Sequence, residues 1–211
     1  RVLFRSNKHS EVRKGVIVAA GLGTRFLPIT KSIPKEMLPV GSKPVLQYIV
    51  EEMADGGIKE ITIVISRGKE SIKEYFKRDL VLERHLKKVG KYSMIKDLVE
   101  LLKKVKFSYV YQEKPLGNGH ALLCAKKKIG SEPFVFSDAD SIIASKVPAT
   151  KQILEVYKKY QAPVIGVQKI KDKKAMTKYG NVYANKTKDN KVFKVEKFVE
   201  KPSLNKVSPH G

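Results

Sequence analysis

Residues 15–20 read Gly-Val-Ile-Val-Ala-Ala, and residues 21–25 continue as Gly-Leu-Gly-Thr-Arg. A short, continuously apolar run of this kind is typical of a strand that is buried on both faces of a parallel sheet. The glycines that follow allow the backbone to approach a phosphate with its amide groups turned inward. This stretch therefore predicts a first buried strand that ends in a phosphate-binding loop.

Strand and helix patterns alternate over the rest of residues 15–169. Further buried strands are predicted at 60–66, 107–111, 134–138 and 163–169. Helices are predicted at 44–55, 70–89 (one or two), 92–105, 119–129 and 150–160. Short alternating runs at 181–184 and 192–199 predict an antiparallel ribbon. We therefore predict an α/β fold, a doubly wound, mostly parallel Rossmann-like sheet with an added antiparallel β-ribbon.

The composition is that of a soluble globular protein: 42% of the 211 residues are hydrophobic and 30% are charged. No apolar run approaches the roughly 20 residues that cross a bilayer, so we expect no membrane partner. Cys124 is the only cysteine, which excludes an intramolecular disulfide and a cysteine-based metal site and favours the cytoplasm. We expect residues 1–14 to be a disordered or non-native leader, and 15–211 to be a single domain that is incomplete at its C-terminus.

The formal net charge of +22 would usually indicate a polyanionic partner such as nucleic acid. Only seven of the 43 basic residues are arginine, the side chain that base recognition and bidentate phosphate binding favour. The lysines are scattered over predicted helix faces and turns. We therefore expect a solvated surface and no specific nucleic-acid partner.

Ligands of a doubly wound sheet bind beyond the carboxyl ends of its strands, where the glycine loop is expected. The loop lacks the third glycine of a Rossmann fingerprint, since Phe26 stands there, and it lacks the Gly-Lys-Ser/Thr of a Walker A loop. It contributes positive charge instead, from Arg25, Lys31 and Lys35. A long loop of this kind in a compact domain is usually functional.

Two polar residues follow later strands at the same predicted edge. The Gln112 amide can both donate and accept, which suits the edge of a uracil base. Asp138 offers an oxygen ligand to a hard cation such as Mg²⁺. Asp140 completes an Asp-x-Asp with Asp138, similar to the motif with which GT-A-type glycosyltransferases hold a metal on a nucleotide sugar. That function is the alternative that these carboxylates leave open.

Several motifs together resemble the sugar-1-phosphate nucleotidyltransferases, in particular those that join UTP to glucose 1-phosphate. They are Gly21-x-Gly23-Thr24-Arg25, Pro34-Lys35-Glu36-Met37-Leu38-Pro39, Ser66-Arg67-Gly68-Lys69, Gln112-x-x-x-Leu116-Gly117-x-Gly119-His120-Ala121, Tyr179-Gly180 and Glu200-Lys201-Pro202. The resemblance spans roughly residues 14–203. Asn118 and Ser137 depart from it, since the uridylyl enzymes commonly have leucine at the first position and the family has proline or glycine at the second.

The resemblance implies a fold of the nucleotide-diphospho-sugar transferase type and a role for each matching residue. Arg25 and Lys35 would be catalytic, and Asp138 would bind Mg²⁺. The nucleotide would be bound by Ala20, Gly21, Gly23, Thr24, Gln112 and Gly117, and the sugar phosphate by Gly180, Glu200 and Lys201. The implied reaction transfers a uridylyl group from UTP to glucose 1-phosphate and releases pyrophosphate.

The resemblance also implies that the family's chain continues past Glu200-Lys201-Pro202 and carries a second metal-binding aspartate there. We therefore expect this chain to bind UTP better than it turns over, and to be weakly active or inactive alone. A homo-oligomer is expected at full length. Other sugar-1-phosphate nucleotidyltransferases, such as one using dTTP, and a non-catalytic nucleotide-binding module stay open.

Overall fold

The computed structural model describes residues 11–209. The first ten residues of the predicted leader lie outside the described residues. The chain divides into two compact units, one up to Val164 and the other from Ile165. The single domain predicted over 15–211 stays a prediction.

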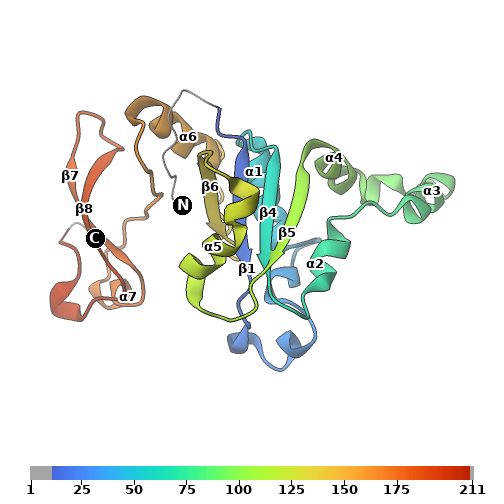
Figure 1. Cartoon of the computed structure of the whole chain (residues 1–211), viewed down its shortest axis with the longest axis horizontal. Helices are drawn as coiled ribbons and strands as arrows, with labels where there is room; N and C mark the ends of the chain where they lie inside the picture. Colours follow the sequence, from blue (N-terminus) through green and yellow to red (C-terminus); the bar gives the residue numbers. More distant parts are fainter. Residues whose placement is uncertain (1–10, 210–211) are drawn as a thin grey trace. The chain divides into compact units, whose positions relative to one another are not determined.

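The first unit is built around a parallel sheet. Its strands are β1 (Lys14–Ala19), β4 (Glu60–Ile65), β5 (Lys106–Tyr111) and β6 (Phe134–Asp138). Among the described residues they form one four-stranded sheet in the order β5-β4-β1-β6 (Figure 1). All three pairings are parallel, and the strands coincide with four of the apolar runs in the sequence. The prediction of a parallel α/β sheet is confirmed.

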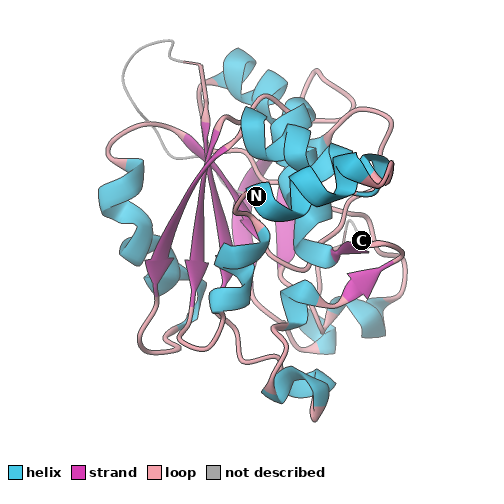
Figure 2. Cartoon of the chain, turned by 90° about the vertical axis from the view of Figure 1, so that its right-hand side faces the viewer, coloured by secondary structure: helices cyan, strands magenta, loops and turns pink. Residues whose placement is uncertain are grey.

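Helices cover both faces of this sheet, as Figure 2 shows from the side. Ile17 of β1 packs in the larger hydrophobic core, beneath α1 (Val45–Asp55) and α6 (Ala149–Tyr160). Val16 points to the opposite face and packs in the second core, against α5 (Gly117–Ile129). Successive strand residues face opposite sides, so a fully apolar strand needs a helical layer on each. The doubly wound arrangement is confirmed.

The two long helical predictions each divide. The stretch 70–89 forms α2 (Glu70–Tyr75) and α3 (Leu80–Lys88), because Asp79 caps the second helix by accepting hydrogen bonds from the backbone of Val81 and Leu82. The stretch 92–105 begins as the 3₁₀ turn η4 (Tyr92–Met94) and continues as α4 (Lys96–Lys104).

The loop after β1 contains short 3₁₀ turns, which are η1 (Thr24–Phe26), η2 (Ile29–Lys31) and η3 (Lys35–Met37). A small antiparallel pair, β2 (Pro39–Val40) and β3 (Lys43–Pro44), then leads into α1. The long loop is therefore locally ordered. Within residues 11–209, no helix has the length and apolar character that a membrane crossing requires.

The second unit contains the predicted ribbon. β7 (Asn181–Lys186) and β8 (Phe193–Val199) pair antiparallel as a sheet of their own, and α7 (Lys173–Met176) precedes them. A final 3₁₀ turn, η5, covers Leu204–Lys206. The ribbon is confirmed as a separate two-stranded sheet among the described residues.

The fifth strand predicted at 163–169 is wrong, since none of these residues is in a strand. Val167 is 62% exposed although it is apolar. A strand is stabilised by hydrogen bonds to a neighbouring strand as well as by apolar side chains. Here the apolar residues form a connection without regular secondary structure, at the point in the sequence where the two units divide.

Candidate active site

The register of the sheet brings the ends of several strands to one edge. Ala19, the last residue of β1, pairs with Ile65 of β4, and Ile65 pairs with Tyr111 of β5. On the other side of β1, Val18 pairs with Asp138. Because the strands are parallel and end in step, the segments that follow them leave the sheet side by side. The predicted glycine loop, Gln112 and Asp138 all belong to this edge.

The glycine loop is closed by its own contacts. Gly23 has φ 67°, a left-handed conformation that side chains with a Cβ rarely adopt. Thr30 Oγ1 donates a 2.8 Å hydrogen bond to the Gly23 carbonyl. Ala20 is buried at the start of the loop, whereas Thr24 and Arg25 are exposed in η1. The loop thus has a fixed base and an exposed cationic turn.

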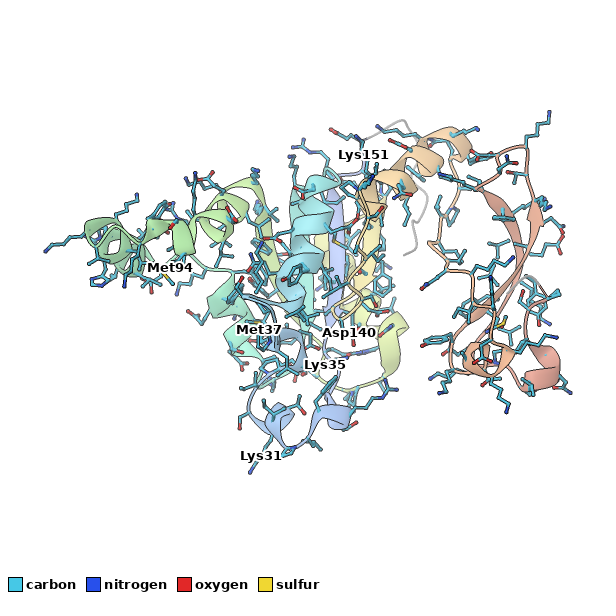
Figure 3. The ribbon with its side chains drawn as sticks, turned by 180° about the vertical axis from the view of Figure 1, so that it is seen from behind. Lys31, Lys35, Met37, Met94, Asp140 and Lys151 are labelled. Carbon is cyan, nitrogen blue, oxygen red and sulfur yellow. The ribbon has the colours of Figure 1, made fainter. Side chains whose placement is uncertain are left out.

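Lys35 runs back from η3 over this loop toward the end of β6. A Cβ built at Gly21 would lie 3.8 Å from Lys35 Cε, and one at Gly23 would lie 3.3 Å from Lys35 Cβ. The Lys35 ammonium reaches Asp140, with Nζ 2.5 Å from Oδ2 (Figure 3). The same view shows Lys31 at the outer end of the loop, away from this pair. Of these two lysines, the structure places only Lys35 against Asp140.

Asp138 is half-buried at the end of β6, and its Oδ1 accepts a 2.9 Å hydrogen bond from Asn118 Nδ2. Burial raises the pKa of Asp138, and the nearby charge of Asp140 raises it further. Two neighbouring carboxylates of this kind suit a hard divalent cation, which would relieve both effects. The described residues hold no group of three or more metal-ligating side chains, so further ligands would have to come from phosphate oxygens and water.

Gln112 is buried at the end of β5, 6% exposed, and its amide is held in place. Its Nε2 donates to the Gly117 carbonyl at 3.0 Å and lies 3.1 Å from His120 Nδ1. Both donor positions are thereby used, so the carbonyl oxygen is the end left to accept from a base. The expected pairing of this amide with the edge of a uracil base stays a prediction.

A buried ion pair beside the loop has no role predicted from the sequence. Lys69 precedes α2 and is 7% exposed, while Glu36 of η3 is fully buried. Lys69 Nζ lies 2.9 and 2.8 Å from the two Glu36 oxygens. Both residues fall inside recognised motifs, yet a Lys and a Glu separated by 33 residues give no signal of pairing before the fold is known.

The residues expected to bind the sugar phosphate lie in the second unit, where the ends of β7 and β8 bring them together. Asn181 pairs with Val199, which places Gly180 beside Glu200. A Cβ at Gly180 would contact the Phe198 ring and lie 3.0 Å from Glu200 Oε2. Lys201 Nζ is 3.7 Å from Glu200 Oε1, and Lys201 has φ 44°, unusual for a residue other than glycine. Their role in binding stays a prediction.

Within the first unit, direct contacts join the predicted residues in two groups. Lys35 lies against Gly21, Gly23 and the Asp138–Asp140 segment, and Gln112 is bonded to Gly117. Asn118 links the two groups by its bond to Asp138. Arg25 remains apart in the exposed turn. The arrangement brings the Lys35 cation and the glycine loop next to Asp140, with Asp138 two residues before it, which suits a phosphorylated ligand that carries a metal ion.

The chain is similar to known proteins over most of its length. Residues 14–209 match the family model described as nucleotidyl transferase. The chain is 45% identical over 193 residues to the UTP–glucose-1-phosphate uridylyltransferase YngB of Bacillus subtilis, covering 92% of this chain and 64% of the relative. The chain thus spans somewhat less than two thirds of that relative's length.

Solved structures of the same kind share the fold. One is a UDP-glucose pyrophosphorylase complexed with UDP-glucose, with a TM-score of 0.86 and 35% identity, covering 95% of this chain and 73% of that one. Another is a UTP-bound UGPase from Acinetobacter baumannii, with a TM-score of 0.84 and 31% identity, covering 95% and 71%. The fold is that of the UDP-glucose pyrophosphorylases. The chain, by its sequence and its sheet, belongs to the nucleotidyl transferase family.

Proposed function

We propose that this protein transfers a uridylyl group from UTP to glucose 1-phosphate, forming UDP-glucose and pyrophosphate. One observation carries the proposal: the Lys35 side chain lies against the glycine loop, and its ammonium contacts Asp140, two residues after the end of β6. A nucleoside triphosphate with its bound cation needs a positively charged side chain for the phosphates and a carboxylate for the cation, close together. The names of the similar proteins, among them a uridylyltransferase and a structure with bound UTP, support the choice of substrate.

The reaction is an in-line displacement at the α-phosphorus. An oxygen of the glucose 1-phosphate forms a bond to that phosphorus, and the bond to the bridging oxygen of the leaving pyrophosphate breaks. The pyrophosphate leaves with its electron pair, and no covalent enzyme intermediate is needed. Positioning and electrostatic stabilisation therefore provide most of the rate enhancement.

Each part of the site has a role in this displacement. The amides of Gly21 and Gly23 would bind the triphosphate, with Arg25 folding over it from η1. Lys35 would neutralise the charge that develops on the α-phosphoryl oxygens, the largest contribution expected of a single side chain here. Gln112 would accept a hydrogen bond from the N–H of the pyrimidine base through its carbonyl oxygen.

We further propose that Asp138 and Asp140 hold a divalent cation, Mg²⁺, together with phosphate oxygens. When bound, such a cation neutralises phosphate charge and fixes the triphosphate geometry. The site fits such a cation chemically, because burial and the charge of Asp140 disfavour the ionised form of Asp138, an effect that a bound cation would relieve. Lys35 contacts Asp140 directly, so its ammonium would lie beside the residues that hold such a cation.

In the second unit we propose that Gly180, Glu200 and Lys201 bind glucose 1-phosphate. A carboxylate accepts hydrogen bonds from two neighbouring sugar hydroxyls, and an ammonium binds a phosphate as a point charge. Glu200 and Lys201 are both about two thirds exposed and are therefore accessible to a ligand. We also propose a cytoplasmic location, which the presence of a single cysteine, Cys124, supports, and a homo-oligomeric assembly.

The test is a pyrophosphate-release screen of nucleoside triphosphates against sugar 1-phosphates with Mg²⁺ present, on this chain and on a version extended to the length of its relatives. We expect the highest release with UTP and glucose 1-phosphate, and its loss in Lys35→Ala but not in Lys31→Ala. The Lys31→Ala variant is a matched control, because it removes the same charge from the outer part of the same loop. Preference for another pair of substrates would overturn the assignment of base or sugar.

A further inference from the structure

The ion pair of Lys69 and Glu36, next to the glycine loop, is unusual because both charged side chains are buried. Glu36 has no exposed surface and Lys69 has 7%. Removing two charged groups from water carries a large desolvation penalty, which only close pairing and complete hydrogen bonding offset. Apolar residues of similar size often serve the fold equally well in such a position. A contribution to the stability of the fold therefore does not explain why this pair is buried. Its contacts indicate a different role.

The contacts of Lys69 extend well beyond Glu36. Its Nζ donates to the backbone carbonyl of Ala19 at 2.7 Å and to that of Gly21 at 2.6 Å, besides both oxygens of Glu36. An ammonium group has three protons, so four acceptors at these distances use all of its capacity. One side chain thus joins the end of β1, the glycine loop, η3 and the segment after β4.

These are the segments that carry the triphosphate-binding groups. Glu36 directly follows Lys35 within η3, so fixing Glu36 fixes the backbone from which the Lys35 side chain projects. The carbonyls that Lys69 holds flank Ala20 at the start of the loop. Lys35 in turn passes within van der Waals distance of a Cβ position at Gly21. Lys69 therefore holds in place both the start of the glycine loop and the backbone that carries Lys35, the two parts between which a phosphate would bind.

The pair has a further electrostatic consequence. Lys69 and Lys35 are neighbouring positive charges, and Glu36 lies against Lys69. Burial lowers the pKa of Lys69 and Lys35 lowers it further, while Glu36 opposes both effects. With Glu36 in place, the site keeps a second cation close to Lys35 without exposing it to the ligand. Both oxygens of the Glu36 carboxylate accept hydrogen bonds from Lys69. Glu36 therefore does not compete with a phosphate for the ammonium of Lys35.

We propose that Lys69, paired with Glu36, is a positioning residue that locks the glycine loop and η3 together and so sets the place of Lys35 before the nucleotide arrives. This inference rests on the proposed function for the identity of the ligand. The locking itself is a property of the unliganded chain and is open to a separate measurement.

The test compares the wild-type chain with a double variant, Lys69→Met with Glu36→Gln. The pair of substitutions keeps both shapes and leaves no buried charge without a partner, so the variant is expected to fold. A matched control combines Arg78→Met with Glu83→Gln. It removes another hydrogen-bonded ion pair with a buried carboxylate, in the α3 region and outside the loop.

Amide hydrogen exchange without nucleotide is measured first. We expect residues 20–38 of the double variant to exchange at least about tenfold faster, while β1 and β4 keep their protection, and we expect no such change in the control. UTP affinity with Mg²⁺ is then measured by calorimetry. Loss of positioning should weaken it by about tenfold or more, since small displacements of binding groups have effects of this size or larger.

The outcomes separate the two proposals. Unchanged exchange over residues 20–38 would overturn the lock, as would equal loosening in the control variant. Faster exchange with unchanged UTP affinity would show that the lock does not serve the site, and would also overturn the inference. If the wild-type chain itself binds no UTP, the proposed function fails, and the exchange measurement still decides whether Lys69 holds the loop.

Discussion

Asn118 Nδ2 donates a 2.9 Å hydrogen bond to Asp138 Oδ1, and this bond joins the first turn of α5 to the end of β6. It stabilises the ionised form of Asp138, opposing the effects of burial and of Asp140. Asn118, at a position where the uridylyl enzymes commonly have leucine, is thus hydrogen-bonded to Asp138, the proposed cation ligand. An outer partner of a ligand orients it and tunes its affinity for the metal.

Replacing Asn118 with alanine should therefore weaken Mg²⁺-dependent UTP binding by about tenfold, the lower end of what loss of an outer partner usually brings. Titration calorimetry at several Mg²⁺ concentrations measures this. Leu123→Ala is the control, since Leu123 lies on the same helix and is 67% exposed. An Asn118→Ala protein that binds Mg²⁺ and UTP as tightly as the wild type would remove Asn118 from the site.

Asp140→Asn is expected to raise UTP affinity several-fold when divalent cations are chelated. The substitution removes a carboxylate that both occupies Lys35 and repels the triphosphate. The same change should reduce the gain in affinity that Mg²⁺ brings. Glu132→Gln is the matched control, because it removes an equal charge near Lys14, at the other end of β1. Weaker cation-free binding in Asp140→Asn would contradict this account of the Lys35 contact.

Stability should depend on pH through Asp138. Its pKa is raised in the folded protein, first by burial and then by Asp140. The folded state therefore binds the proton more tightly than the unfolded state, whose aspartates titrate near 3.9. The contribution of Asp138 to stability is favourable below that value and is lost as the pH rises through the raised pKa.

Asp138→Asn should consequently be more stable than the wild type above this window in metal-free buffer, with the advantage vanishing toward pH 4. Urea unfolding at a series of pH values gives both free energies of unfolding. An advantage of the variant that is constant with pH, or that grows toward acid, would show that the carboxyl is not destabilised by burial in the folded state.

The contact between α1 and α6 gives a prediction for stability alone. A Cβ at Gly56 would lie 2.5 Å from both Thr150 Cβ and Thr150 Cγ2, which is too close without a shift of the helices. Gly56→Ala should lower the free energy of unfolding by about 1–3 kcal/mol, as other overpacking substitutions do. Gly119→Ala is the comparison, because Gly119 is in a helix and no atom beyond its chain neighbours and the backbone of that helix lies within 4 Å of its Cβ position. It should be neutral or stabilising by up to about 1 kcal/mol.

The central sheet could be predicted from the sequence because its strands are short apolar runs such as residues 60–65, whose burial on both faces requires that composition. The segment 163–169 has a similar composition, but it pairs with no neighbouring strand. A local sequence pattern does not indicate which distant segments will form hydrogen bonds with each other. The division of 70–89 has a local cause instead, since Asp79 caps α3 by accepting hydrogen bonds from the backbone two and three residues further on.

The candidate site was predictable as a set of residue types and only partly as a set of contacts. Asp138 and Gln112 stand at strand ends, where a parallel sheet gathers ligand-binding groups. The bonds of Lys69 to Ala19 and Gly21 depend on the three-dimensional path of the loop, and so does the use of both Gln112 donors within the protein. Such contacts follow from the fold and have no counterpart in spacing along the chain.

The central claim is that the segments at the carboxyl edge of the sheet bind one phosphorylated nucleotide together. Backbone-amide NMR of the isotope-labelled chain, titrated with UTP in the presence of Mg²⁺, tests it most directly. We predict saturable shifts at residues 20–25, at Lys35, at 112–119 and at 138–140, all following one binding curve. Shifts that avoid these segments, or that follow different binding curves in each of them, would contradict a shared site.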